Sequence, residues 1–182
     1  MNSLQAYRDD NKRFVDWFYN VHRPLVVEAL GFEYHKEDVV LTGSRSTGLA
    51  YPNSDMEYAV IVDDATTEDE REEIATQMLM VYNILNERGE FATHDLRAKQ
   101  IKTKAGLPLL ILTNLVLAEL PLTKLKMTVR TRSQQAKIIA NDAVFLQRSE
   151  EELFQYIKDI EQAYNTGNQE RYLQMKQWQR VS

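Results

Sequence analysis

Two short apolar runs lie close together in the first third of the chain and predict a pair of neighbouring strands. The first run covers residues 39–41 and the second covers Met56–Val62. β-Branched and aliphatic runs of this kind are typical of strands that are covered on both faces. The polar segment between them contains Gly43, Gly48 and Pro52, which favour turns and helix ends. We therefore expect two buried strands joined by a loop with a short helix after residue 44.

Apolar residues at helical spacing precede these strands. Residues 1–35 predict two helices, the second running from Pro24 to Leu30 and ending at Gly31. Proline is favoured in the first turn of a helix, and glycine is favoured directly after its end. We expect both helices to pack beside the sheet through their aromatic side chains.

The segment after the second strand predicts one long helix and two further strands. Thr67 to Glu70 is a capping-box pattern, and apolar residues then recur at helical spacing until Gly89. Residues 91–103 alternate as in a strand, and residues 107–113 form an apolar run with a proline near its start, where the missing N–H is tolerated.

The remaining segment, residues 116–182, predicts a helical extension. One helix begins after Ser149, and Gly167 separates it from a last helix. The whole chain, 1–182, then predicts a single α/β (α+β) domain: N-terminal helices in 1–35, a mixed β-sheet in 36–115 and helices in 116–182. We expect the extension to complete the core, to cover the site or to form a dimer interface.

Composition limits the classes of protein and site. The chain has no cysteine, which excludes disulfide frameworks and thiolate metal sites. We find no signal-peptide pattern and no apolar run of membrane-spanning length, so we expect a cytoplasmic or other reducing compartment and no membrane partner. The formal net charge of −5 argues against nonspecific coating of nucleic acid.

Two acidic residues, Asp55 and Glu57, stand one residue apart at the head of the second strand. Alternate strand residues face the same side, so their carboxylates project together and repel unless a cation lies between them. Mg²⁺ or Mn²⁺ fits this need, because hard cations take oxygen ligands and share them with substrate phosphates. The alternative is an ordinary strand connection in which Asp55 caps a turn and Glu57 lies in solvent.

The Gly43-Ser44 pair, the spacer and the pair Asp55 and Glu57 resemble the signature of the DNA polymerase β-like nucleotidyltransferase superfamily. Residues 86–114 are similar, more weakly, to the RNA-tailing branch of that superfamily, which carries poly(A) and terminal uridylyl transferases. In that branch a third carboxylate lies on a later strand, and the best-matching position here is Leu110. Leucine can neither bind a metal nor accept a proton.

The resemblance implies a site that binds a nucleoside triphosphate with Mg²⁺ and transfers a nucleoside monophosphate to a hydroxyl. Asp55 and Glu57 are the catalytic and metal-binding candidates. The nucleotide-binding candidates are Gly43, Ser44, Arg45, Ser54, Arg130 and Arg132. The acceptor is RNA, a protein or a small molecule, and a homodimer or partner subunit is compatible with the short chain. One alternative is pyrophosphate transfer on the same fold. The other is a catalytically inactive binding or assembly module, for which Leu110 is the evidence.

Overall fold

The computed structural model describes residues 1–31 and 33–181, with side chains through residue 177. Its centre is a five-stranded sheet with the strand order β1-β2-β5-β4-β3. The strands are β1 (Val39–Thr42), β2 (Met56–Val62), β3 (Arg97–Lys102), β4 (Pro108–Thr113) and β5 (Leu125–Thr131). The main helices are α1 (Leu4–Trp17), α2 (Arg23–Leu30), α3 (Ser44–Thr47), α4 (Glu68–Glu87), α5 (Arg132–Phe145), α6 (Glu150–Asn165) and α7 (Gln169–Val181).

The sheet is mixed, as the sequence predicts. β2 and β5 pair in parallel, whereas β1 with β2, β4 with β5 and β3 with β4 pair antiparallel. The helix predicted after Thr67 is also confirmed: Thr67 Oγ1 accepts a hydrogen bond from the amide of Glu70 at 3.2 Å and caps α4.

The prediction that residues 116–182 are helical is wrong for β5, which lies in the middle of the sheet. The signal was present, because Leu125, Met127 and Val129 alternate with polar residues and are fully buried. Such a period of two is the mark of a strand with one packed face. Lys126 and Thr128, which stand between them, belong to the other face of this strand.

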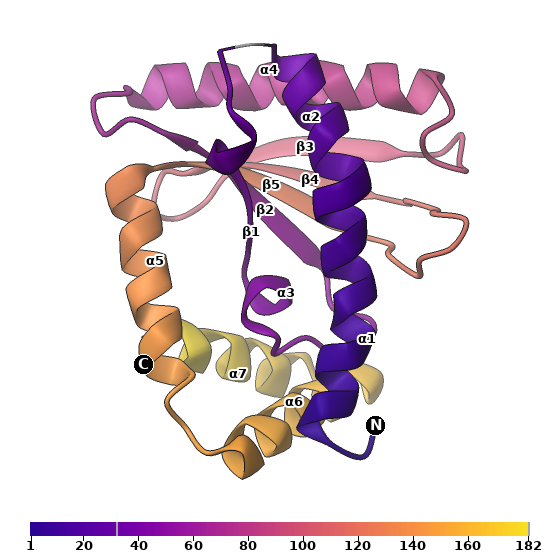
Figure 1. The fold of residues 1–182 in the computed structure, drawn as a ribbon, viewed down its shortest axis with the longest axis vertical. Helices are drawn as coiled ribbons and strands as arrows, with labels where there is room; N and C mark the ends of the chain where they lie inside the picture. The colour runs from indigo at the N-terminus through magenta and orange to yellow at the C-terminus, as the bar shows by residue number, and fades with distance from the viewer. Residues whose placement is uncertain (32, 182) are drawn as a thin grey trace.

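One face of the sheet forms the main core. α4 lies along this face, and α1 and α2 pass along the β1 edge (Figure 1). Tyr58, Leu110 and Met127 are fully buried there together with side chains of α4 such as Met78. Burial of this apolar face is the main driving force for folding.

The N-terminal helices follow one another through a five-residue π-helical segment, Phe18–His22. Pro24 stands in the first turn of α2, and Gly31 ends it with a φ of 95°, so this part of the prediction is confirmed. The π-helical segment brings His22 into the core, where its Nε2 lies 2.7 Å from the Tyr82 hydroxyl. Tyr82 in turn lies 2.5 Å from the hydroxyl of Tyr58 on β2.

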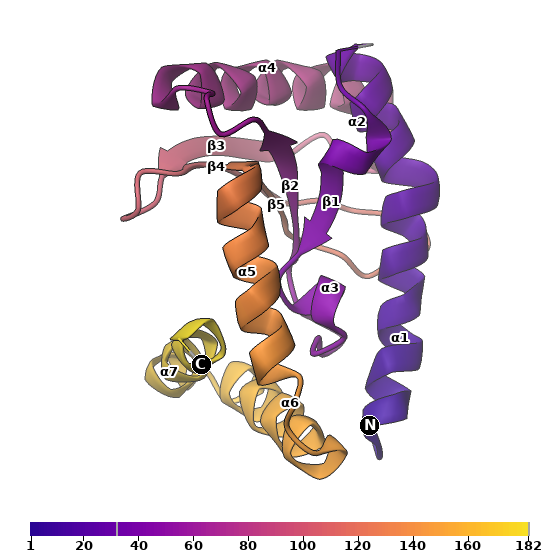
Figure 2. The ribbon, with the colours of Figure 1, turned by 60° about the vertical axis from the view of Figure 1, so that its left-hand side comes forward.

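A second apolar cluster lies on the opposite side of the molecule, among α1, α5, α6 and α7 (Figure 2). Tyr7 of α1, Phe145 of α5 and Ile157 of α6 are fully buried in it. Tyr51, from the loop before β2, is 1% exposed and packs in the same cluster. The C-terminal helices are therefore packed against the loop that leads to Asp55. Among the described residues, no helix is both long and apolar enough to cross a bilayer.

Candidate active site

The Gly43-Ser44 corner joins β1 to α3 and lies beside Glu57. Gly43 has a φ of 72°, a conformation that favours glycine. A Cβ atom at Gly43 would lie 3.7 Å from Glu57 Oε2, so the main chain approaches this carboxylate closely. Gly48, with a φ of 78°, ends α3 and turns the chain back.

Asp55 and Glu57 stand at the start of β2 and lie on one face of the sheet. Glu57 pairs with Thr42 of β1 on one side and with Lys126 of β5 on the other. The two carboxylates keep 33% and 23% of their side-chain surface exposed. This is the face opposite Tyr58, and it contains the corner formed by Gly43.

Three cationic side chains surround the two carboxylates. Lys126 Nζ lies 3.4 Å and Lys124 Nζ 3.8 Å from Asp55 Oδ2. Arg130 Nη2 lies 3.5 Å from Glu57 Oε1. Of these three residues, only Arg130 is among the site residues predicted from the sequence; Lys124 and Lys126 are brought to the acidic pair by the pairing of β5 with β2.

No carboxylate stands on the part of β5 that faces this pair. The side chains of β5 on the Glu57 face are Lys126, Thr128 and Arg130. Leu110 pairs with Met127, which pairs with Tyr58, so Leu110 lies on the opposite, packed face. The prediction that Leu110 marks the position of a third carboxylate is therefore wrong, because both its face and its strand are separated from Glu57.

The residues at this site do not fit a divalent metal ion. Mg²⁺ needs several oxygen ligands and an excess of negative charge around it. Here the two carboxylates are matched by three cations, Lys124, Lys126 and Arg130, whose positive charge opposes the binding of a divalent metal ion. Among the side chains that the structure describes, no three metal-ligating residues gather anywhere.

Arg45, a predicted phosphate ligand, is buried and holds the loop before Asp55. Only 1% of its surface is exposed, and its guanidinium donates to Asn11 Oδ1 at 3.1 Å and to the carbonyls of Pro52 and Ser54 at 3.0 and 2.8 Å. It also stacks on the ring of Phe14, 3.6 Å from its centre. Burial lowers the pKa of Arg45 to about 10, against the attraction of nearby carboxylates. Its position therefore fits a structural role and not phosphate binding.

Ser54 and Arg132 are also engaged elsewhere. Ser54 is 3% exposed, and its hydroxyl accepts a hydrogen bond from the Tyr51 amide at 3.0 Å. Arg132 binds Asp38 at 3.1 Å and Asp63 at 3.4 Å, and these contacts raise its pKa, chiefly through Asp38. Asp63, the second partner of Arg132, follows the far end of β2. At about 3.3 Å per strand residue, it lies roughly 20 Å along the strand from Glu57. The structure thus separates Arg132 from the carboxylate pair.

A cavity of about 600 Å³ lies beside the corner, between β1, α3 and α5. Its polar lining includes Thr42, Thr47 and Gln135, and its apolar lining includes Ile61 and Ile139. Arg130 links this cavity to the carboxylates. Its Nη1 donates to Thr42 Oγ1 at 2.7 Å and to Gln135 Oε1 at 3.2 Å, while its Nη2 faces Glu57.

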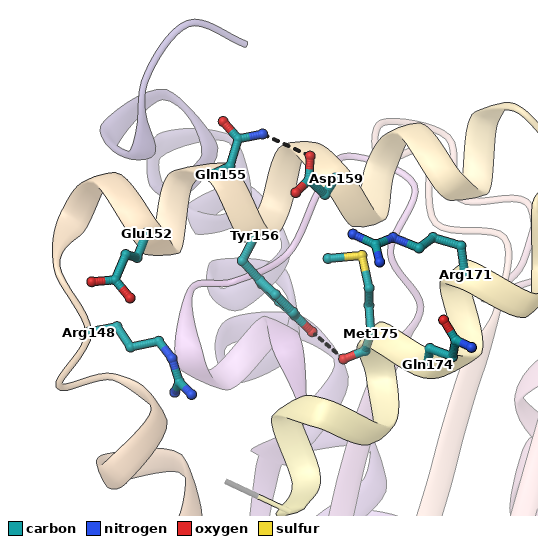
Figure 3. A pocket seen from close by; sticks show the side chains of 8 residues that line it. All are labelled: Arg148, Glu152, Gln155, Tyr156, Asp159, Arg171, Gln174 and Met175. Atoms are coloured by element: carbon teal, nitrogen blue, oxygen red, sulfur yellow. Dashed lines mark hydrogen bonds between the residues drawn. The ribbon is translucent and has the colours of Figure 1, made fainter.

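A second groove, of about 620 Å³, lies between α6 and α7 (Figure 3). Tyr156 crosses it and donates from its hydroxyl to the carbonyl of Met175 at 3.2 Å. Gln155 donates to Asp159 along the same side of α6 at 2.8 Å. The lining contains none of the predicted site residues. The cavity between β1, α3 and α5 is lined by Arg132 and by residues on both sides of the Gly43-Ser44 corner, so it is the better candidate for a nucleotide.

One solved structure with a TM-score above 0.5 supports the fold, and others are similar over a smaller part of the chain. The structure of the GLD-2/RNP-8 complex matches with a TM-score of 0.54 and 11% identity, covering 94% of this chain and 61% of that one. The Cid1 poly(U) polymerase with bound MgGTP matches with a TM-score of 0.39 and 23% identity, covering 58% and 28%. A cytoplasmic RNA terminal U-transferase matches with a TM-score of 0.32 and 24% identity, covering 54% and 24%. This chain thus spans less than two thirds of each of these proteins.

Comparison by sequence identifies the family. No curated protein sequence matches the chain. The sequence model of the family described as nucleotidyltransferase domain matches residues 24–162, well over half of the chain. This region contains the sheet, the Gly43-Ser44 corner and the pair Asp55 and Glu57. The resemblance to the polymerase β-like superfamily is therefore confirmed, and the chain belongs to the nucleotidyltransferase domain family.

Proposed function

We propose that this chain is a nucleotide-binding member of its family that does not carry out metal-dependent nucleotidyl transfer, and that it acts as a binding or assembly module. The observation that carries the proposal is the composition of β5 beside the carboxylate pair. Lys126, Thr128 and Arg130 fill the β5 positions on the same face of the sheet as Glu57, and Lys126 is directly opposite it. The evidence for an inactive protein is therefore the set of side chains on β5, next to Asp55 and Glu57, and not Leu110.

These side chains are unsuited to activating an acceptor hydroxyl. A general base must accept a proton at the reacting oxygen, and an ammonium or guanidinium group has no acceptor. Thr128 is 2% exposed and donates its hydroxyl to the carbonyl of Pro108 at 2.9 Å. No group on the described part of β5 then takes the role of the base.

The cavity beside the corner is suited to binding. Its apolar walls, Val40, Ile61 and Ile139, offer a surface for a base and sugar, and the hydroxyls of Thr42 and Thr47 offer polar contacts. Gly43 has no side chain to keep a phosphate from the main chain, and Arg130 supplies positive charge at the adjacent Thr42. A nucleoside triphosphate therefore fits as the ligand, with its phosphates toward Gly43, Ser44 and Arg130.

The second candidate function is transfer of a nucleoside monophosphate to a hydroxyl with Mg²⁺ or Mn²⁺. It is favoured by the intact pair Asp55 and Glu57 on one face and by Gly43, where an added Cβ atom would lie 3.7 Å from Glu57 Oε2. Positioning and charge neutralisation provide most of the catalysis in this chemistry. RNA ends, proteins and small molecules are the acceptors to test.

The two functions are separated by a transfer assay and a binding assay on the same protein. We expect calorimetric titration to detect binding of at least one nucleoside triphosphate, and Asp55→Asn to retain it. Incubation of labelled triphosphates with RNA or protein acceptors, in Mg²⁺ and in Mn²⁺, is expected to give no labelled product. A product that forms with the wild type and is lost in Asp55→Asn would establish the transferase and overturn the proposal, as would the absence of any nucleotide binding.

A further inference from the structure

We propose that the ammonium group of Lys126 takes the place of the divalent cation in this site, so that triphosphate binding does not need a metal. This inference rests on the proposed nucleotide-binding function and specifies its chemistry. The ligand is the metal-free triphosphate of a nucleotide, recognised by the cations of the chain itself.

The strand register fixes the position of Lys126. Glu57 and Lys126 are direct neighbours on the parallel strands β2 and β5, and their side chains leave the same face. From there Lys126 Nζ reaches to 3.4 Å from Asp55 Oδ2. The ammonium group therefore neutralises Asp55, on the strand position next to Glu57, while Arg130 takes the same part for Glu57 at 3.5 Å.

The net charge of the side chains at the site also favours a phosphate over a metal cation. Asp55 and Glu57 contribute two negative charges, and Lys124, Lys126 and Arg130 contribute three positive charges, so these five side chains together carry an excess of one positive charge. Asp142, which also interacts with Arg130, lies in the cavity and is not part of this group. The side chains keep between 11% and 37% of their surface exposed, so water screens them less than on an open surface. A site of this sign attracts a phosphate oxygen directly and repels a second cation.

Lysine is suited to this position because its ammonium group is compact and carries three donors. Two donors remain after one is directed to Asp55, and they are available to phosphate oxygens above the corner. Mg²⁺ bound to a triphosphate would reduce the negative charge that Lys126 and Arg130 attract. We therefore expect Mg²⁺ to weaken binding.

The first test compares triphosphate binding with and without metal. Calorimetric titrations use ATP, UTP and inorganic tripolyphosphate, each in EDTA and in excess Mg²⁺. Binding in EDTA is expected to be at least as tight as in Mg²⁺, and tighter by about threefold or more for the best ligand. Binding that appears only with Mg²⁺ would overturn the inference.

The second test exchanges the built-in cation for a carboxylate. Lys126→Asp places a third carboxylate beside Asp55 and Glu57, and we expect it to bind Mn²⁺ about tenfold or more tightly than the wild type. Electron paramagnetic resonance of free Mn²⁺ measures this binding. Lys104→Asp changes the same charge on an exposed turn and is the matched control. Equal Mn²⁺ binding by the wild type and Lys126→Asp would contradict the inference.

Lys126→Gln keeps the test decisive if the aspartate variant does not fold. It removes the ammonium group without adding charge, and we expect it to weaken triphosphate binding in EDTA about tenfold. Unchanged binding in a folded Lys126→Gln protein would exclude the role of Lys126. Metal-dependent binding without product would refute this inference alone, whereas labelled transfer product would refute the proposed function.

Discussion

The two faces of the central sheet are built from the same strands but differ in what they do with polar groups. On the face toward α4, Tyr58, Leu110 and Met127 are fully buried in the main core. On the other face, Glu57 and Lys126 remain partly exposed. Glu57 forms an ion pair with Arg130, and Lys126 forms one with Asp55. Because alternate residues of one strand serve opposite faces, a change of one position separates a residue needed for stability from one available to a ligand.

The contrast also holds for hydrogen bonding. On the packed face, the polar atoms of His22, Tyr58 and Tyr82 are satisfied by one another at 2.5 to 2.7 Å. On the open face, opposite charges lie 3.4 to 3.8 Å apart. The first arrangement fixes the fold, and the second is the group of charges to which we assign the proposed binding of phosphates.

Introducing the same carboxylate on each face is the strongest test of this comparison. Leu110→Asp removes a fully buried side chain and leaves an unpaired carboxylate in the core, so we expect a loss of at least about 4 kcal/mol in the free energy of unfolding. Lys126→Asp places the carboxylate on the open face and is expected to remain folded. Urea denaturation followed by circular dichroism measures both. Equal destabilisation of the two variants would remove the distinction between the faces.

The next largest effect is expected at Arg45, which belongs to the open side of the sheet but is itself buried. Arg45→Met leaves the carbonyls of Pro52 and Ser54 without their donor, and we expect a loss of about 3 kcal/mol in the free energy of unfolding. Arg132→Met, at an arginine with 57% of its side chain exposed, is the control and should leave the unfolding midpoint nearly unchanged. A stable Arg45→Met protein would mean that the loop before Asp55 does not depend on this residue.

His22 gives the packed face a pH dependence. Burial lowers the pKa of His22 to about 3, whereas the unfolded chain has a histidine pKa of about 6.5. Between these values the unfolded state binds one more proton, so the free energy of unfolding falls as the pH decreases, by about 1.4 kcal/mol per pH unit. Denaturation of the wild type and of His22→Gln at pH 6.5, 5.5 and 4.5 measures the difference. Parallel pH profiles would show that His22 is not the group responsible.

Much of this organisation was predictable from local sequence patterns. Thr67 and Ser149 cap the helices that were expected after them, and Gly43 and Gly48 adopt the positive φ angles that a corner requires. These features depend on a few neighbouring residues and on backbone sterics. The nearness of Gly43 to Glu57 followed from two strands that are adjacent along the chain and pair antiparallel.

The remainder depended on contacts between distant segments. Nothing near Arg45 in the sequence shows that Asn11 and Phe14 of α1 enclose it. The environment of Asp55 was hidden in the same way, because Lys126 reaches it only once β5 inserts next to β2. A parallel pair of this kind joins strands separated by the whole of α4, β3 and β4, and its register cannot be obtained from either strand alone.

Lys124 tests how far the open face depends on individual charges. It lies further from Asp55 Oδ2 than Lys126 does, 3.8 against 3.4 Å, and it has the more exposed side chain, 37% against 27%. Water therefore screens Lys124 more strongly, and Lys124→Gln should weaken triphosphate binding only about twofold. Calorimetric titration of Lys124→Gln and Lys126→Gln in EDTA, at low and at 0.5 M salt, orders the two effects, and salt should diminish that of Lys124 first. If Lys124→Gln weakens triphosphate binding more than Lys126→Gln does, the role of the built-in cation belongs to Lys124, the residue directly before β5.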